Sequence, residues 1–138
     1  MEPKRVLVVD DELDMRIFLS TVFETAGYRA VSARDGRDGF AKAAETPPDL
    51  IVLDLMMPGE GGVRMYRELK EDVRLREVPV FILSGVDRAT FYHYLKMLNV
   101  RPEESIPEPD AYLEKPPTPE SVLDIAGRLL GPPVSGAS

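Results

Sequence analysis

Residues 50–54 read LIVLD, a run of four apolar side chains that ends in one acid. A short apolar run of this kind is typical of a strand buried on both faces of a parallel sheet. The same pattern stands at residues 5–9 (RVLVV) and 80–83 (VFIL), and weaker runs stand at 29–33 (RAVSA) and 111–113 (AYL). The sequence therefore predicts five strands.

Helical periodicity fills the intervals between these runs. In the first interval, apolar residues recur at offsets 0, 3, 4, 7, 8 and 11, as on one face of a helix. These residues are Met15, Phe18, Leu19, Val22, Phe23 and Ala26. Gly27 is suited to end that helix, and Asp35 is suited to cap the next one. A third helix follows residues 59–62.

The last two helices carry clear boundary signals. Asp87 is a candidate N-cap, and an inward-facing stripe follows it: Phe91, Tyr94, Leu95 and Leu98. Thr118 and Pro119 fit the start of the last helix, and Gly131 fits its end. Strands that alternate with helices of this length predict an α/β fold, a doubly wound five-stranded parallel sheet with helices on both faces.

Composition limits the kinds of function. The chain has 138 residues, 43% hydrophobic and 30% charged, which is typical of one globular domain. Its 24 acids and 17 bases give a net charge of −7, which disfavours direct contact with nucleic acid or an anionic membrane surface. The sequence contains no Cys, no run long enough to cross a bilayer and no visible signal peptide, so we expect a cytoplasmic protein. We expect one domain over residues 1–131, followed at 132–138 by a flexible tail or the start of a linker.

Polar side chains gather where the expected strands end. Asp10 and Asp11 follow the first strand, Asp54 the third, Ser84 the fourth and Lys115 the fifth. The carboxyl ends of parallel strands share one edge of the sheet, so we expect these side chains to form a site. Crowded carboxylates without Cys or His favour Mg2+, with Mn2+ possible. A carboxylate nucleophile, a hydroxyl and an ammonium beside that cation meet the needs of phosphoryl transfer.

Each of these residues also has an ordinary structural interpretation. Asp10 and Asp11 could simply cap the first helix, Asp54 could be a loop acid, and Lys115 could be a solvated charge. The combination at four strand ends is what favours a site. His93 lies off the apolar stripe of its helix, so we expect it to face solvent.

Four segments together resemble the receiver domain of two-component response regulators. They are VLVVDDE (6–12), LIVLDLMMPGEGG (50–62), VFILSG (80–85) and AYLEKP (111–116). The resemblance runs in order and spacing from about residue 5 to residue 130. It implies a flavodoxin-like sheet in the order 2-1-3-4-5, the order that the fold takes in a chemotaxis receiver.

The resemblance also implies a role for each site residue. Asp54 would be the phosphoacceptor, taking a phosphoryl group from a sensor histidine kinase or a histidine phosphotransfer protein. Asp11, Asp54 and the backbone carbonyl of Met56 would bind Mg2+ directly, and Asp10 would act through metal-bound water. Lys115 would contact the phosphoryl group.

Further residues would report phosphorylation. Ser84 would contact the phosphoryl group and act with Tyr112 as a switch, and the Lys115–Pro116 bond would be cis. The surface of the fourth helix, fifth strand and fifth helix would then signal to a downstream protein or pass the phosphoryl group along a relay. The resemblance implies a monomer or a phosphorylation-linked dimer that catalyses only its own phosphorylation and dephosphorylation.

Three features depart from the family pattern. Residues 59–62 read GEGG where a bulky apolar residue is usual. Lys115 follows Ser84 by 31 residues, an unusually long separation, and the excess lies at 99–109. We expect that segment to alter the signalling surface. Met56 and Val86, two residues beyond Asp54 and Ser84, are both apolar, which predicts a long-lived acyl phosphate.

Three alternatives remain open from the sequence. A magnesium-dependent phosphatase with an aspartyl-phosphate intermediate would need a second acid at position 56, where this chain has Met56. A flavin mononucleotide binder would need a Ser/Thr-rich loop after the first strand, where this chain has DDELD. A receiver-like scaffold that never takes phosphate would keep the fold, but such scaffolds usually lose the residues at positions 54 and 115.

Overall fold

The computed structural model describes residues 2–57, 61–101, 103 and 105–131. Its five parallel strands form one sheet in the order β2-β1-β3-β4-β5, which confirms the predicted fold class. The strands are β1 (Arg5–Val9), β2 (Arg29–Ala33), β3 (Leu50–Asp54), β4 (Val80–Ser84) and β5 (Ala111–Glu114). The helices are α1 (Leu13–Thr25), α2 (Gly36–Glu45), α3 (Gly61–Glu71), α4 (Arg88–Leu98) and α5 (Pro119–Leu130).

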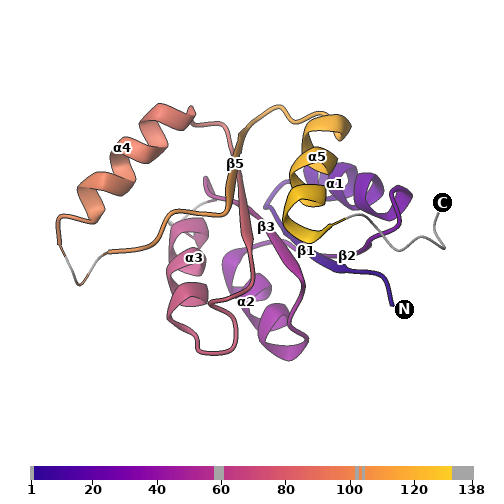
Figure 1. The fold of residues 1–138 in the computed structure, drawn as a ribbon, viewed down its shortest axis with the longest axis horizontal. Coiled ribbons are helices and arrows are strands. Elements are labelled where there is room, and N and C mark those ends of the chain that lie inside the picture. The colour runs from indigo at the N-terminus through magenta and orange to yellow at the C-terminus, as the bar shows by residue number, and fades with distance from the viewer. Residues whose placement is uncertain (1, 58–60, 102, 104, 132–138) are drawn as a thin grey trace.

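Helices cover both faces of the sheet (Figure 1). α1 and α5 lie on one face, where Val8 and Val52 join a core with Phe23 and Val122. α2, α3 and α4 lie on the other face, over a second core that contains Leu53. Strand side chains point alternately to opposite faces, so a continuous apolar run supplies both cores at once.

The helix boundaries follow the predicted signals. The side chains of Asp35, Asp87 and Thr118 accept hydrogen bonds from backbone N–H groups in the first turns of α2, α4 and α5. Each bond satisfies a donor that has no partner within its helix. Gly27, after α1, has a φ of 100°, a conformation that costs a residue with a side chain about 1 kcal/mol or more.

The prediction that Tyr94 faces the core is wrong. Tyr94 of α4 is 42% exposed, whereas Phe91 and Leu95 are buried. Tyr94 lies at the edge of the helical stripe, and it lines an open apolar hollow with Met57 and Val86 instead of entering the core.

The long segment between α4 and β5 is irregular where the structure describes it, as expected, but it also contributes to the core. Ile106 is buried, and its N–H donates to the side-chain oxygen of Asn99 at 3.0 Å. The hydroxyl of Tyr66 in α3 donates to the carbonyl of Pro107 at 2.6 Å. Removing residues 100–108 would therefore remove part of the core, so that deletion would not isolate an effect on signalling.

Among the described residues, no helix is both long and apolar enough to span a membrane. The expected tail or linker at 132–138 lies outside the described residues.

Candidate functional site

Strand register places the predicted site residues at one edge of the sheet. Val9 pairs with Leu53, so Asp10 and Asp54 emerge side by side. Asp54 pairs with Leu83 and Ser84 pairs with Glu114, which brings Ser84 and Lys115 to the same edge. The Lys115 N–H donates to the Ser84 carbonyl at 2.8 Å. The pairing of neighbouring strands therefore brings Asp10 and Lys115, which are 105 positions apart in the sequence, into one site.

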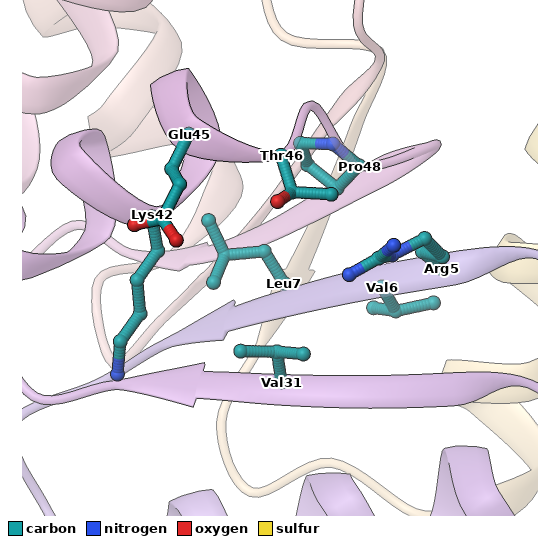
Figure 2. Close-up of a pocket in the computed structure, with 8 residues that line it drawn as sticks. All are labelled: Arg5, Val6, Leu7, Val31, Lys42, Glu45, Thr46 and Pro48. Atoms are coloured by element: carbon teal, nitrogen blue, oxygen red, sulfur yellow. The ribbon is translucent and has the colours of Figure 1, made fainter.

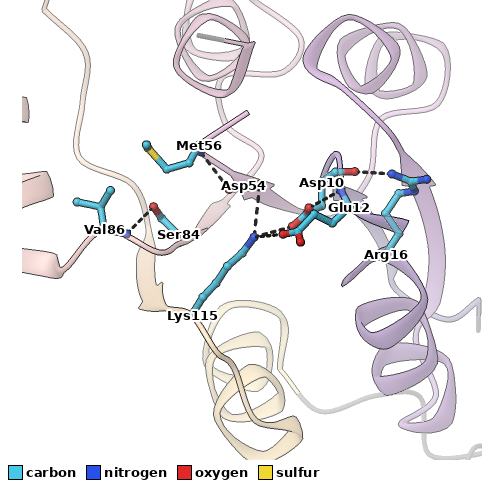
Figure 3. A network of polar contacts seen from close by, with 8 residues as sticks. All are labelled: Asp10, Glu12, Arg16, Asp54, Met56, Ser84, Val86 and Lys115. Carbon is cyan, nitrogen blue, oxygen red and sulfur yellow. Dashed lines mark hydrogen bonds and ion pairs between the residues drawn. The ribbon is translucent and has the colours of Figure 1, made fainter. Parts of the chain in front are cut away.

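Lys115 is at the centre of the polar network (Figure 3). Its Nζ lies 3.1 Å from Asp10 Oδ2, 3.4 Å from Asp54 Oδ2 and 3.5 Å from Glu12 Oε1. Asp10 and Asp54 are only 1% and 3% exposed, and the Lys115 side chain is 17% exposed. Ion pairs this buried are screened far less than surface pairs.

The three aspartates at this edge have the geometry of a cation site. Asp10, Asp11 and Asp54 each offer a carboxylate oxygen, and these oxygens lie within 4.8 Å of one another. Three carboxylates beside one ammonium leave two negative charges uncompensated. A divalent cation would neutralise them, and an all-oxygen donor set suits Mg2+ or Mn2+. The residues present therefore fit such a cation.

Burial and nearby charges shift the pKa values of Asp54 and Lys115. Burial, followed by the charge of Asp10, raises the pKa of Asp54 above its ordinary value, and these effects outweigh the Met56 N–H and Lys115. Burial alone would lower the pKa of Lys115, but Asp10 and Asp54 outweigh burial and raise it. The Lys115 side chain therefore stays protonated and positively charged at neutral pH, whereas Asp54 holds a proton to a higher pH than an ordinary aspartate.

The raised pKa of Asp54 predicts a pH-dependent affinity for Mg2+. Mg2+ at this site would need the ionised carboxylate, so it would have to displace the proton from a protonated Asp54. We expect the affinity to fall as pH is lowered, beginning above the range where exposed aspartates titrate. NMR titrations with MgCl2 at a series of pH values between 7.5 and 4.5 would measure this. A constant affinity down to the ordinary aspartate pKa would contradict the expectation.

Ser84 and Tyr112 lie behind the acid cluster. Ser84 is fully buried, and its Oγ accepts a hydrogen bond from the Val86 N–H at 3.1 Å. Tyr112 is buried against Phe91 with ring centroids 4.6 Å apart, and its hydroxyl donates to the Val86 carbonyl. The aromatic ring is thus turned inward. The Lys115–Pro116 bond is cis, as expected.

The start of α3 touches the backbone of the site. A Cβ placed on Gly62 would lie 2.5 Å from the carbonyl oxygens of Asp54 and Leu55. Only glycine lets α3 approach this closely. The glycine at position 62, inside α3, therefore has a packing cause, while residues 58–60 lie outside the described part of the chain.

The sequence analysis missed two polar residues at the site, Glu12 and Arg16. Glu12 pairs with Lys115, and its N–H donates to Asp10 Oδ1 at 2.9 Å. Arg16 donates from Nη1 to the Asp10 carbonyl at 2.8 Å. Glu12 is also the N-cap position of α1, and its own side chain makes no cap hydrogen bond. Asp10 thus accepts one backbone N–H at the start of α1, as the capping interpretation expects, and it also pairs with Lys115. His93 is exposed, as predicted.

One hollow lies beside the acid cluster and another lies at β1 and β2. An apolar hollow of about 570 Å³ lies between α4 and the end of β3, and Asp11, Met56 and Val86 help to line it. A smaller hollow of about 290 Å³ lies between β1, β2 and the end of α2, with Arg5 and Lys42 at its rim (Figure 2). Lys42 pairs with Asp38 and donates to the Ser32 carbonyl.

A known protein family matches most of this chain. The sequence model of the response regulator receiver domain matches residues 6–100. The chain belongs to this family. Receiver domains are phosphoacceptor signalling modules of two-component systems, and they interact with histidine kinases or phosphotransfer proteins.

Relatives of this receiver domain differ in length. The chain is 30% identical to protein PilH of Pseudomonas aeruginosa over 126 residues, which cover 91% of this chain and 97% of PilH. It is 29% identical to the phosphate regulon transcriptional regulatory protein PhoB of the same species, over 96% of this chain but only 62% of PhoB. The chain therefore matches nearly the whole of one relative and less than two thirds of the other.

Solved structures give the same receiver fold. The chemotaxis response regulator CheY4 of Vibrio cholerae superposes with a TM-score of 0.78 and 27% identity, over 92% of this chain and 98% of that protein. The receiver domain of a signal transduction histidine kinase from Syntrophus aciditrophicus gives a TM-score of 0.76 and 27% identity, over 92% and 89% of the two chains. This similarity extends past residue 100, so it includes the region of β5 that the family match leaves out.

Proposed function

We propose that this receiver domain is a phosphorylation-controlled switch that takes a phosphoryl group onto Asp54 from a phosphohistidine. The donor would be a sensor histidine kinase or a histidine phosphotransfer protein. The observation that carries the proposal is the meeting of Asp10, Asp11, Asp54 and Lys115 at the carboxyl edge of the sheet. A buried carboxylate ringed by charge-neutralising groups suits nucleophilic attack on phosphorus.

In this proposal, oxygens of Asp11, Asp54 and the Met56 carbonyl would hold Mg2+, or Mn2+, directly, and Asp10 would act through metal-bound water. When bound, the cation supplies positive charge to the phosphoryl oxygens. Lys115 supplies a second positive charge, and its contact with Asp54 places it at the reacting group. Ser84 would donate its hydroxyl to a phosphoryl oxygen once its hydrogen-bond geometry changes.

The transfer step uses one bond exchange. An Asp54 carboxylate oxygen attacks the phosphorus, and the bond from phosphorus to the histidine nitrogen breaks as the electron pair returns to the ring. Attack by water on the resulting acyl phosphate would release inorganic phosphate and restore the carboxylate. These are the only reactions that the domain would catalyse, since it acts on its own side chain.

The phosphorylated domain would pass its signal on through contacts with another protein or through a phosphorelay. Ser84 and Tyr112 would couple the phosphoryl group to the surface of α4, β5 and α5, including the segment at 99–110. We place the receiver domain at residues 1–131 and a tail or linker at 132–138, in a cytoplasmic protein that is a monomer or a phosphorylation-linked dimer. The net charge of −7 supports a protein partner over nucleic acid or membrane.

Incubation with acetyl phosphate and MgCl2, followed by intact mass measurement, tests the proposal. We expect the mass of one phosphoryl group to be added, and EDTA to prevent the addition. Absence of any addition, in a protein shown by NMR to bind Mg2+, would favour the scaffold alternative or a receiver that accepts only a protein donor. Phosphohistidine-loaded kinase from the same organism would separate these two.

The lifetime of the acyl phosphate gives a separate prediction. Met56 and Val86 border the site with apolar side chains, and both line the hollow beside it. The double substitution Met56→Asn, Val86→Glu would introduce polar groups that hold and orient water. We expect dephosphorylation to become at least about tenfold faster, less than the roughly 100-fold or more that a well-positioned general base contributes. Decay of the phosphorylated mass over time would measure it, and an unchanged rate would count against the role of these side chains.

A further inference from the structure

Each buried aspartate of the site divides its two oxygens between different partners. Asp10 Oδ1 accepts the Glu12 N–H at 2.9 Å, and Asp54 Oδ1 accepts the Met56 N–H at 3.0 Å. The Oδ2 atoms of both residues face Lys115 Nζ, at 3.1 and 3.4 Å. The ammonium therefore occupies the carboxylate oxygens that backbone N–H groups leave free.

A divalent cation at the aspartate cluster would compete with Lys115 for the negative charge of Asp10 and Asp54. The three aspartate oxygens within 4.8 Å of one another are the donors available to such a cation. Lys115 is only 17% exposed, so an ammonium that lost both buried partners would lose charge compensation in a poorly solvated place. The cost of displacing it would weaken cation binding.

Glu12 differs from the two buried partners of Lys115. Its carboxylate is outside the aspartate cluster, and its side chain is 65% exposed. Its backbone N–H donates to Asp10 Oδ1 at 2.9 Å, and its carboxylate lies 3.5 Å from Lys115 Nζ. In Figure 3, dashed lines run from Lys115 Nζ to Asp54, Asp10 and Glu12.

We propose that Glu12 is a positioning residue that retains Lys115 when the aspartates hold a divalent cation. Glu12 supplies the displaced ammonium with a partner that the cation does not use. It thereby lowers the cost of cation binding and keeps the lysine beside Asp54. This inference rests on the cation site of the proposed function but not on phosphorylation.

Substitution of Glu12 tests the inference with the metal alone. Titration of ¹⁵N-labelled protein with MgCl2, followed through the amides of residues 10–12 and 54–56, gives the dissociation constant. Asp14→Asn is the matched control, because Asp14 is an exposed acid in the first turn of the same helix and its loss removes the same charge. We expect Glu12→Gln to weaken Mg2+ binding about threefold more than Asp14→Asn does, the effect of an exposed ion pair.

Removing Lys115 distinguishes an effect of Glu12 that acts through Lys115 from the general effect of one negative charge on Mg2+ binding. Lys115→Met takes away the competing ammonium, so we expect tighter Mg2+ binding than in the wild type. Adding Glu12→Gln to Lys115→Met should then weaken binding no more than adding Asp14→Asn does. Equal effects of Glu12→Gln and Asp14→Asn in the wild-type background would overturn the inference, as would an excess effect of Glu12→Gln that persists without Lys115. If the wild type binds no Mg2+, the cation site itself is wrong, a failure distinct from equal effects of the two substitutions.

Discussion

Asp54→Asn is expected to abolish phosphoryl incorporation from acetyl phosphate. Asparagine keeps the shape of the side chain but has no anionic oxygen to attack phosphorus. We expect incorporation at least about 100-fold below the wild type, since the nucleophile itself is lost. Intact mass spectrometry over a time course measures it. Asp124→Asn, at an exposed acid in α5, should incorporate phosphoryl as the wild type does.

The thermal unfolding midpoint of Asp54→Asn shows whether this variant is folded. Burial and Asp10 raise the pKa of Asp54, so the ionised side chain is held unfavourably in the metal-free fold at neutral pH. Replacing it with a neutral amide should therefore raise the thermal midpoint without Mg2+. Mg2+ should stabilise the wild type more than the variant. If Asp54→Asn incorporates the phosphoryl group at the wild-type rate, another residue is the acceptor.

Gly62→Ala is expected to disturb the fold at the site. The added Cβ would lie 2.5 Å from two backbone carbonyl oxygens, and backbone cannot rotate away as a side chain can. Overpacking of this kind costs about 1–3 kcal/mol, and contact with backbone favours the upper end. A loss of about 3 kcal/mol would lower the thermal midpoint by roughly 10 °C. Thermal unfolding followed by circular dichroism measures it.

Gly127→Ala is the matched control for that substitution. Gly127 lies inside α5, and a Cβ there would meet no atom within 4 Å. Alanine in a helix interior is about 0.5–1 kcal/mol more favourable than glycine, so this variant should be at least as stable as the wild type. Equal losses from the two substitutions would contradict the close approach of α3 to Asp54 and Leu55.

The sequence predicted the sheet and the site edge well because both follow from short-range rules. A continuous apolar run such as residues 50–53 has one stable environment, between two helical layers. Parallel strands then place Asp10, Asp54 and Ser84 at a common edge whatever the loops do. Caps such as Asp35 and Asp87 were recognisable because they satisfy donors of their own helix.

Other features depend on packing between distant segments, which residue spacing does not encode. The pairing of Glu12 with Lys115 depends on the rotamers of two long side chains. Burial of Ile106 depends on how an irregular segment meets α3, and exposure of Tyr94 depends on how α4 lies over the sheet. These contacts are settled by tertiary structure rather than by local pattern.

The central claim is that Asp54 carries the phosphoryl group, and chemical trapping tests it most directly. The wild-type protein is incubated with acetyl phosphate and MgCl2 and then reduced with borohydride, which converts an aspartyl phosphate to homoserine. Peptide mass spectrometry locates the converted residue. Homoserine at position 54, absent when EDTA is added, is the result we predict. Conversion at Asp10, Asp11 or another acid, in protein that has gained a phosphoryl group, would contradict the assignment of the acceptor.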